Sequence, residues 1–413
     1  MTALGRHGFD VVIVGAGPAG ASLAIRVARA GYSVALVDRA QFPRSKPCGE
    51  FMSPPCVPML AELGLDVFDL DGGAARGHEV SGMRLSAFER GAVGRYRAVG
   101  RAAPPMTLGI GIRRELLDAN LVDLARAQDG VTVLEGHAVL DLERERGGRI
   151  VGIRVREPDG MERTLRASVT VGADGLRSRV ARSLGVVQPI PWLNRFALVT
   201  RYAGVDATDF GELHLFEGGY FAAVDVDAGL FTLNLVVDGA SLPKGRAALD
   251  AMFDERLQRV PVLAERLRSA RRFEPLRAYG PLGVRTKRQV FEGAVLVGDA
   301  AGYVDPMTGE GIYLALRGAD LLTDALRVRF ETGSERRAWR QYTRARRHEI
   351  APKLAMSLLL QRAIRKPWLV ERFARLVERR PGLLDFVVSL TGDYVPLREA
   401  LRPGALVRAW SSS

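Results

Sequence analysis

The segment from residue 10 to residue 38 constrains the fold of this chain more than any other stretch. An apolar, β-branched run comes first, and the turn at residues 15–20 (GAGPAG) follows it directly with the spacing G-x-G-x-x-G. In such a turn the first glycine permits a tight bend, the second lets a pyrophosphate approach the backbone, and the third lets the next helix pack closely on the strand. A strand that runs straight into this turn predicts a dinucleotide site.

A helix and a second strand complete this unit. We expect a helix over residues 19–30, with Pro18 at its start, where a missing N–H costs least, and a strand over residues 33–38. The helix N-terminus favours an anion, because its N–H groups are free. Asp38 ends the second strand, where a carboxylate can accept hydrogen bonds from both ribose hydroxyls. The whole unit is much more specific than the glycine turn alone.

Length and composition indicate a cytoplasmic enzyme of two or three packed units. The chain has 413 residues, of which 47% are apolar and 26% charged, as in ordinary globular proteins. No run of eighteen apolar residues and no apolar leader is present, which argues against a membrane span and a secretory signal. The two cysteines, Cys48 and Cys56, lie close together and do not resemble a disulfide framework.

The net charge of +12 is concentrated near the C-terminus. From Thr332 onward, 17 Lys and Arg residues face 7 Asp and Glu, so this region carries ten of the twelve net charges. The rest of the chain is close to neutral, which argues against a nucleic-acid-binding protein. Two interpretations of the basic region stay open: a solvated helical face, or a surface that contacts acidic lipid or an acidic partner protein.

Three separated motifs together resemble one family. The turn at residues 15–20 is followed by GADGLRS at residues 172–178, and then by GDAAG at residues 298–302 with Pro306 and GEG at residues 309–311. This order and spacing resemble the flavoprotein monooxygenases of the para-hydroxybenzoate hydroxylase type over roughly residues 8–345. The resemblance implies bound FAD and a Rossmann-like α/β fold.

Two further stretches look like particular branches of that superfamily. KPCGE at residues 46–50 and DPMTGEGI at residues 305–312 look most like the geranylgeranyl reductases. Flavin-dependent halogenases share an F-P-R then G-E pattern, which residues 42–44 and 49–50 reproduce. The loop therefore does not decide the reaction.

The resemblance implies roles for individual residues. Arg114 should face the cofactor, Asp299 should bind its ribityl or pyrophosphate part, and the helix that starts near Gly309 should point its N-terminus at the flavin. One departure is Ala181, which stands where an arginine usually closes the second motif. The residues expected to bind FAD are Gly15, Gly17, Pro18, Ala19, Gly20, Asp38, Arg39, Arg44, Cys48, Gly49, Arg114, Asp174, Asp299, Gly309, Gly311 and Ile312.

Two of these residues also have a purely structural interpretation. Asp174 can cap the turn after its strand, and Cys48, the one catalytic candidate, can be a small buried filler, because buried cysteines are usually inert. The five histidines are scattered and show no metal-binding spacing, so no metal site is predicted.

Strand and helix patterns divide the chain into a discontinuous FAD-binding domain and an inserted β-rich substrate domain. Residues 112–127, 246–269 and 309–329 read as helices; residues 131–134, 138–142, 150–155, 165–171, 195–202, 211–216, 220–226, 230–237 and 289–297 read as strands. The predicted division is FAD-binding domain at 1–75, 112–187 and 285–345, an excursion into the substrate domain at 76–111, substrate domain at 188–284, and a helical basic region at 346–413.

Four functions remain open, and each requires different residues in the substrate domain. The preferred one is an NAD(P)H-dependent monooxygenase that hydroxylates a hydrophobic aromatic or polyketide-like molecule, with NAD(P)H as a transient electron donor. The second is a geranylgeranyl reductase-type C=C reductase with Cys48 at the flavin edge, but that family's Y-x-W-x-F-P motif is reduced to YFAAVD at residues 220–225. A halogenase lacks its W-x-W-x-I-P motif here, and a non-catalytic flavin carrier would not need so large a substrate domain.

Overall fold

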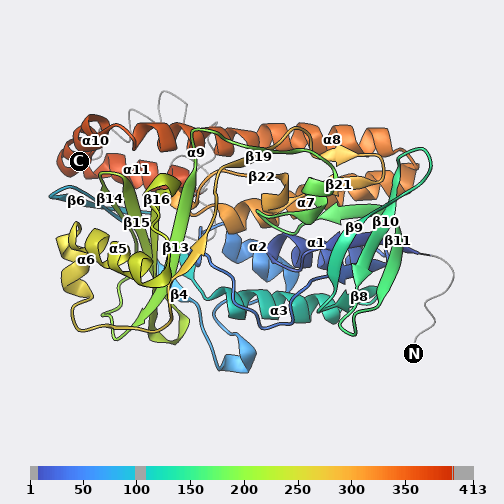
Figure 1. Cartoon of the computed structure of the whole chain (residues 1–413), viewed down its shortest axis with the longest axis horizontal. Coiled ribbons are helices and arrows are strands. Elements are labelled where there is room, and N and C mark those ends of the chain that lie inside the picture. Colours follow the sequence, from blue (N-terminus) through green and yellow to red (C-terminus); the bar gives the residue numbers. More distant parts are fainter. Residues whose placement is uncertain (1–7, 98–107, 393, 395–413) are drawn as a thin grey trace.

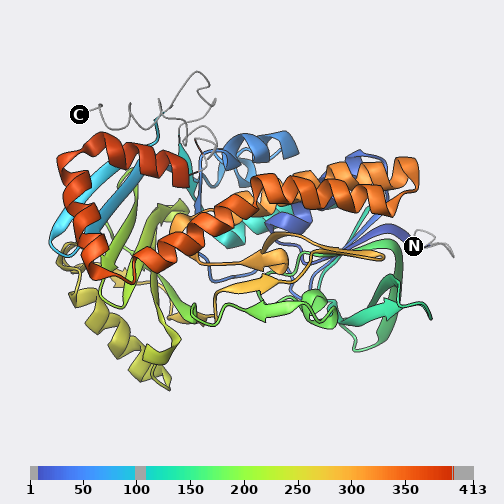
Figure 2. The ribbon, with the colours of Figure 1, turned by 90° about the horizontal axis from the view of Figure 1, so that it is seen from above.

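The protein is an elongated α/β molecule with one large sheet toward each end. The computed structural model describes residues 8–97, 108–392 and 394. Helices α8 (Glu335–Glu349) and α9 (Ala351–Ala363) run along one side from the first sheet toward the second (Figure 1). The view from above shows the same two helices crossing the molecule diagonally (Figure 2). The predicted α/β fold class is confirmed.

The first sheet is built around β1 (Phe9–Val14), the strand that the sequence predicts before the glycine turn. It lies between β2 (Val34–Val37) and β11 (Glu162–Gly172), and all three strands are parallel. β8 (Val131–Leu134) extends the sheet beyond β2, and β21 (Ala294–Leu296) extends it beyond β11, again in parallel. The carboxyl ends of β1, β11 and β21 therefore meet at one edge, which is where open α/β sheets bind ligands.

Alternate residues of β1 face two separate apolar cores. Val11 and Ile13 pack toward a helical layer, and Val12 and Val14 pack toward the antiparallel meander formed by β9 (Ala138–Arg144), β10 (Ile150–Arg156) and β11. The helices whose residues join the first core are α1 (Pro18–Arg29), α2 (Cys56–Leu63), α3 (Arg114–Arg126), α7 (Gly311–Thr332) and α8. Burial on both faces explains why residues 11–14 of β1 are continuously apolar.

The second sheet forms most of the predicted substrate domain. Its strand order is β17-β13-β16-β15-β14-β5-β6, with β18 also paired to β13. β5 and β6 come from the predicted excursion and join β14 in the same sheet. The bounds are β5 Gly82–Ala87, β6 Arg90–Arg95, β13 Arg195–Ala203, β14 Phe210–Phe216, β15 Gly219–Val226, β16 Leu230–Asp238, β17 Arg271–Arg272 and β18 Arg277–Tyr279.

Short elements complete the described fold. Two separate three-stranded sheets have the strand orders β3-β7-β4 and β12-β19-β22. The bounds are β3 Phe51–Met52, β4 His78–Val80, β7 Gly109–Gly111, β12 Val187–Pro189, β19 Val284–Thr286, β22 Gly302–Tyr303 and α4 Arg179–Ser183. The 3-10 turns are η1 Asp71–Gly73, η2 Asp227–Gly229, η3 Gly239–Ser241, η4 Gly298–Ala301 and η5 Pro306–Thr308.

Two elements differ from the sequence prediction. The helix expected over residues 246–269 is wrong as a single element: α5 (Arg246–Gln258) and α6 (Pro261–Arg266) are separate, because Pro261 starts a new helix. The strand expected over residues 289–297 is a hairpin of β20 (Val290–Phe291) and β21, because Gly293 turns the chain with a φ of +76°.

Prolines begin the C-terminal helices. Pro352 lies in the first turn of α9, while α10 (Pro367–Arg379) and α11 (Pro381–Thr391) each start at a proline. The other two predicted interruptions, Pro396 and Pro403, lie outside the described residues. α10 and α11 pack against β5 and β6 of the second sheet. Within the described part of the chain, no helix is both long and apolar enough to cross a membrane.

Candidate active site

The turn between β1 and α1 leaves no room for a side chain at two of its glycines. A Cβ at Gly20 would lie 1.8 Å from the carbonyl oxygen of Gly15, and a Cβ at Gly15, whose φ is +100°, would lie 2.6 Å from a carbonyl oxygen just after β11. Gly17 faces open space instead, where a Cβ would lie 3.6 Å from Nη2 of both Arg44 and Arg114. Two guanidinium groups and the N-terminus of α1 therefore converge on one place, which fits a pyrophosphate.

Asp118 holds these two arginines in position. Arg114 Nε and Nη2 donate to the two oxygens of Asp118 at 2.8 and 2.7 Å, and Arg44 Nη1 lies 3.0 Å from Asp118 Oδ2. Burial lowers the pKa of Arg114, but the Asp118 charge and hydrogen bonds outweigh this effect and raise that pKa above its ordinary value. One carboxylate against two guanidiniums leaves net positive charge beside Gly17.

Asp38 ties together the two turns at the ends of β1 and β2. Its Oδ2 accepts a hydrogen bond from Ala16 N at 2.8 Å, and its Oδ1 accepts one from Ala40 N at 2.9 Å. The carboxylate is half-buried and keeps lone pairs for ribose hydroxyls. The neighbouring Arg39 is exposed.

Asp174 has the capping role that was its alternative interpretation. Its Oδ1 accepts a hydrogen bond from Ser178 Oγ at 2.5 Å, and its Oδ2 accepts bonds from the backbone N–H groups of Arg179 and Val180 at 2.6 and 3.2 Å. Burial raises the pKa of Asp174 against these bonds. The carboxylate thus orders the start of α4, and its residue is not part of the cavity wall.

Lys46 and Asp299 bring opposite charges to the cavity wall beside Arg114. Burial, together with the charge of Arg114, lowers the pKa of Lys46. Burial raises the pKa of Asp299, although the positive charges of Lys46 and Arg114 oppose that rise. Asp299 comes just after β21, so its half-buried carboxylate lies at the same sheet edge as the glycine turn. A polar ligand part with hydroxyl groups fits this position.

The N-terminus of α7 opens onto the same cavity. A Cβ at Gly311 would meet no atom within 4 Å, whereas Gly309 is in tight contact, because a Cβ there would lie 2.5 Å from the ring of Phe51. Gly311 and Ile312 both line the cavity. The free N–H groups and dipole of this 22-residue helix favour negative charge at that point.

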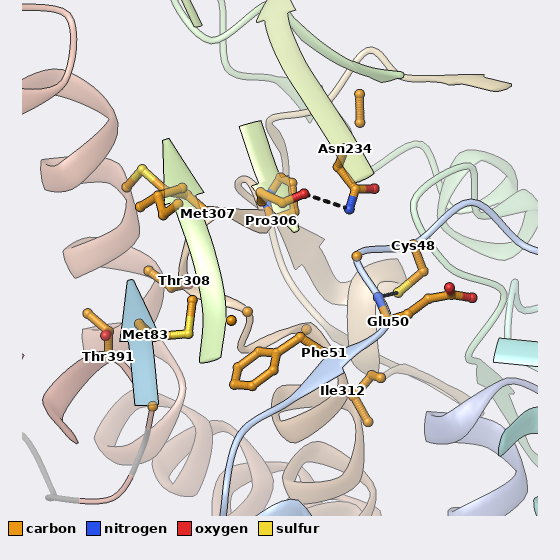
Figure 3. A pocket seen from close by; sticks show the side chains of 18 of the residues that line it. Cys48, Glu50, Phe51, Met83, Asn234, Pro306, Met307, Thr308, Ile312 and Thr391 are labelled. Atoms are coloured by element: carbon orange, nitrogen blue, oxygen red, sulfur yellow. Dashed lines mark hydrogen bonds between the residues drawn. The ribbon is translucent and has the colours of Figure 1, made fainter. Parts of the chain in front are cut away.

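The cavity has a volume of about 550 Å³ and extends from the glycine turn across the second sheet to the C-terminal helices. Figure 3 shows part of its wall, with Cys48, Asn234 and Met307 around one space. Its size lies within the range of small-molecule sites. Its apolar wall includes Met83, Leu85, Leu213, Leu215, Ala222 and Ala223 of the sheet, Leu360, Leu369, Phe373, Leu384 and Val388 of α9, α10 and α11, and Ile364 between α9 and α10.

Cys48 and Gly49 form the cavity wall on the loop before β3. Cys48 Sγ accepts a hydrogen bond from Glu50 N at 3.4 Å (Figure 3). The same thiol interacts with the guanidinium of Arg114. The thiol is half-buried and not part of a disulfide. Cys48 therefore lies on the cavity wall beside Arg114.

Glu50 anchors this loop to the second sheet. The side chain is 1% exposed, and its two oxygens accept four hydrogen bonds: from Arg114 N at 2.9 Å, from Thr232 Oγ1 at 2.6 Å, from Arg201 Nε at 2.8 Å and from Arg201 Nη2. Burial raises the pKa of Glu50, and these donors oppose the rise. The backbone φ of +58° is unusual for a residue with a side chain. This network fixes the loop relative to α3, β13 and β16.

Asn234 is a polar residue in the middle of the apolar strand β16. It is 3% exposed, and its Nδ2 donates to Ala222 O at 3.2 Å. Asn234 lines the cavity near Gly49, where a Cβ would lie 3.8 Å from Nδ2. Its amide oxygen can accept a hydrogen bond from a ligand.

Comparisons with known proteins agree with this geometry. A family described as "FAD binding domain" matches residues 8–206. The 6-methylpretetramide 4-monooxygenase of Streptomyces rimosus is 30% identical over 75% of this chain and 73% of its own length. The chain belongs to the FAD-dependent oxidoreductase superfamily.

Other proteins similar to this oxidoreductase are named for different reactions. A menaquinone reductase of Mycolicibacterium smegmatis is 29% identical and covers 98% of this chain and 95% of its own length. The structure of a myxobacterial chondrochloren halogenase superposes with a TM-score of 0.77 at 24% identity, over 95% of this chain and 99% of that one. At that identity the likeness shows the shared fold alone.

FAD fits the residues of this oxidoreductase. The crowded Gly15 and Gly20, the open Gly17 with its two guanidiniums, and the open N-terminus at Gly311 lie where the sequence places the pyrophosphate and the flavin. Cys48, Gly49, Arg114 and Asp299, from three distant parts of the chain, line this space, and Nη2 of Arg44 lies beside it at Gly17. Pro18, Ala19 and Ile312 also line it, whereas Asp38 and Arg39 lie beyond the cavity wall.

Several functional candidates of the oxidoreductase carry no motif of their own. Asn234, Tyr279 and Tyr303 line the cavity but come from ordinary strand sequence. Burial raises the pKa of Tyr279 to about 12 and also raises the pKa of Tyr303 well above its ordinary value, so both phenols stay neutral donors. The sequence does single out Asn234 in one way: burying an amide in the middle of an apolar strand costs free energy unless the amide is hydrogen-bonded, so its presence there suggests a role.

A second buried polar cluster of the oxidoreductase lies behind this wall. Asp305 Oδ1 accepts hydrogen bonds from Tyr220 OH, from Gln361 Nε2 at 2.7 Å and from Met307 N at 3.0 Å. Asp305 Oδ2 has no hydrogen-bond partner among the described residues. Burial raises the pKa of Asp305 to about 6. This residue links the loop before α7 to β15 and α9.

Proposed function

We propose that the protein is an NAD(P)H-dependent monooxygenase that hydroxylates a hydrophobic aromatic molecule. The observation that carries this proposal is the shape of the wall beside the cofactor site, where Ala197, Gly211, Ala222 and Ala223 line the cavity. The geranylgeranyl reductase motif has a tryptophan at the position of Ala222. These small side chains occupy little of the cavity and leave room beside the sheet for a flat ring system. The relationship to the Streptomyces rimosus monooxygenase supports the same reaction.

Each part of the wall has a role in this reaction. Bound FAD supplies the redox chemistry, in which two electrons from NAD(P)H allow one oxygen atom of O₂ to enter a C–H bond while the other leaves as water. The apolar side chains of the second sheet and the C-terminal helices exclude bulk water from the reacting ring. Asn234 orients a polar group of the substrate, and the N-terminus of α7 stabilises negative charge.

A C=C reductase is the second candidate, and one comparison favours it. The menaquinone reductase of Mycolicibacterium smegmatis matches 98% of this chain. In such a reaction two electrons and two protons add across a double bond, and oxygen is not consumed. Cys48 would then lie beside the reacting bond, since it lines the cavity next to Arg114.

Oxygen dependence separates these two reactions. The FAD-loaded protein is reduced anaerobically with NADH or NADPH and mixed with alkylated phenols, aromatic polyketides or a prenylated quinone, and ¹⁸O₂ is then added to half of each sample. Hydroxylation predicts a product that carries one ¹⁸O atom and forms only with oxygen. A product two hydrogens heavier that forms without oxygen would overturn the proposal and establish the reductase.

Cys48→Ala provides an independent comparison, with Cys56→Ala as the matched control. Both changes remove a thiol, but Cys56 is fully buried in α2 away from the cavity wall. In a hydroxylase Cys48→Ala costs about 1 kcal/mol of stability and leaves turnover near the wild-type value. Turnover that fails after normal flavin reduction in this variant, and not in the control, would favour the reductase.

A further inference from the structure

The corner between α9 and α10 combines exposed apolar side chains with positive charge. Leu359 and Trp368 are 66% and 61% exposed, which places them among the most exposed large apolar residues described. Arg362, Arg365 and Lys366 lie between them in the sequence and are also exposed; Arg365 is paired with Asp238 at 3.1 Å, and both arginines lie over the ring of Trp192. These five residues are called the basic corner below. Single exposed apolar residues are ordinary, but two beside three cations indicate a surface with a partner.

The basic corner continues along the outer face of α10. Arg372, Arg375 and Arg379 are exposed and follow Trp368 at spacings of four, seven and eleven residues, so all four share one side of the helix. The opposite side is buried against the second sheet through Val370, Ala374 and Val377. Residues 351–380 contain eight Lys and Arg against two Asp and Glu. α10 thus has a basic outer face that ends in an exposed tryptophan.

The inner sides of the same two helices form the cavity wall. Leu360 of α9, Ile364 just after it, and Leu369 and Phe373 of α10 line the apolar cavity, and Leu369 directly follows the exposed Trp368. The basic corner and the cavity that would hold the substrate therefore lie on opposite sides of the same two helices. α10 lies at the end of the molecule opposite the first sheet (Figure 1), so a flat partner can approach it without contacting the cofactor domain.

We propose that the basic corner and the outer face of α10 dock on a lipid bilayer that carries acidic headgroups. Arginine binds phosphate groups in two-pronged geometry, and an indole prefers the boundary between headgroups and acyl chains. A basic helix face with an aromatic anchor is the pattern of helices that lie on membranes. Docking there brings the cavity next to a source of hydrophobic molecules. The inference does not depend on whether the reaction is hydroxylation or reduction.

Vesicle flotation of the full-length, FAD-loaded protein tests this assignment. The vesicles contain phosphatidylcholine with or without phosphatidylglycerol, and the variants are Trp368→Ser and Arg372→Glu/Arg379→Glu. The matched controls are Phe273→Ser, at an apolar side chain that is 50% exposed, and Arg259→Glu/Arg268→Glu, at exposed arginines near α6. Retained FAD and an unchanged circular dichroism spectrum establish that each variant is folded.

The proposal predicts binding to the acidic vesicles alone, and binding that weakens with salt. The double charge reversal should reduce it more than about tenfold, and Trp368→Ser should reduce it severalfold, while both controls bind like the wild type. Absence of binding to acidic vesicles at low salt would overturn the proposal. Equal losses of binding in the control variants would also overturn it, because they would indicate a merely electrostatic attraction. Binding to poly-glutamate that is as tight as binding to vesicles and insensitive to Trp368→Ser would overturn it too, because it would indicate a protein-binding surface.

Discussion

Replacing Asp305 by asparagine should make the stability of this protein less dependent on pH. The residue is 6% exposed, and one oxygen of its carboxylate accepts three hydrogen bonds. An asparagine can keep these bonds with its amide oxygen and place its NH₂ group where Oδ2 has no partner among the described residues. The change therefore removes a titratable proton and preserves the contacts of the cluster.

The expected magnitude follows from the difference in pKa between the folded and unfolded chain. Burial raises the folded pKa of Asp305 from 3.8 to about 6. Between these values the native protein holds a proton that the unfolded chain has lost, so the free energy of unfolding decreases as the pH rises. At about 1.4 kcal/mol per pH unit, the loss reaches about 3 kcal/mol above pH 6. Asp305→Asn should lack this decrease.

Urea unfolding followed by circular dichroism, from about pH 4.5 to about pH 8, measures this difference. The wild type should lose stability relative to Asp305→Asn as the pH rises to about 6, and the difference should then stay constant. Asp209→Asn is a flat control, because the Ser81 hydrogen bond lowers the pKa of Asp209 from its ordinary value of 3.8, so its contribution is lost only at a pH below the measured range and its difference from the wild type should stay constant. Parallel pH curves for the wild type and Asp305→Asn would refute the assigned burial and pKa.

Three further changes test the cofactor site. Gly20→Ala should abolish FAD retention after gel filtration, because its Cβ would lie 1.8 Å from Gly15 O, whereas Gly147→Ala, which meets no atom within 4 Å, should retain FAD. Asp38→Ala should weaken FAD binding by about 1–3 kcal/mol in a fluorescence titration, and an unchanged affinity would exclude its role at the ribose. Glu50→Gln should lower the stability to urea by about 1–3 kcal/mol, because an amide cannot accept all four hydrogen bonds; wild-type stability would contradict the described network.

The sequence predicts the cofactor half of the molecule well, because local patterns determine it. The predicted β1, its glycine turn and α1 are confirmed to within a residue or two. Gly15 and Gly20 have no space for side chains, and this steric requirement is why glycine occurs at both positions of the motif. Arg114 and Asp299 could be named only through the resemblance, since nothing near them in the sequence shows that they meet.

The other half depends on contacts between distant segments, which leave no local pattern. Glu50 and Arg201 are 151 positions apart, and neither has a motif that predicts their ion pair. The sequence describes the region after residue 346 as basic helices, but the inner sides of α9, α10 and α11 form the cavity wall. The apolar residues of this region repeat at helical spacing, which predicts that one side of each helix is buried. The pattern does not predict which part of the protein they pack against.

The flavin content of the purified protein tests the central claim most directly. The full-length chain is denatured with acid, and the released cofactor is identified by chromatography and quantified against the protein. The structure predicts one non-covalently bound FAD per chain, since two guanidiniums, the α1 N-terminus and the open Gly17 form a site for its pyrophosphate. A colourless protein that also fails to bind added FAD would contradict the account.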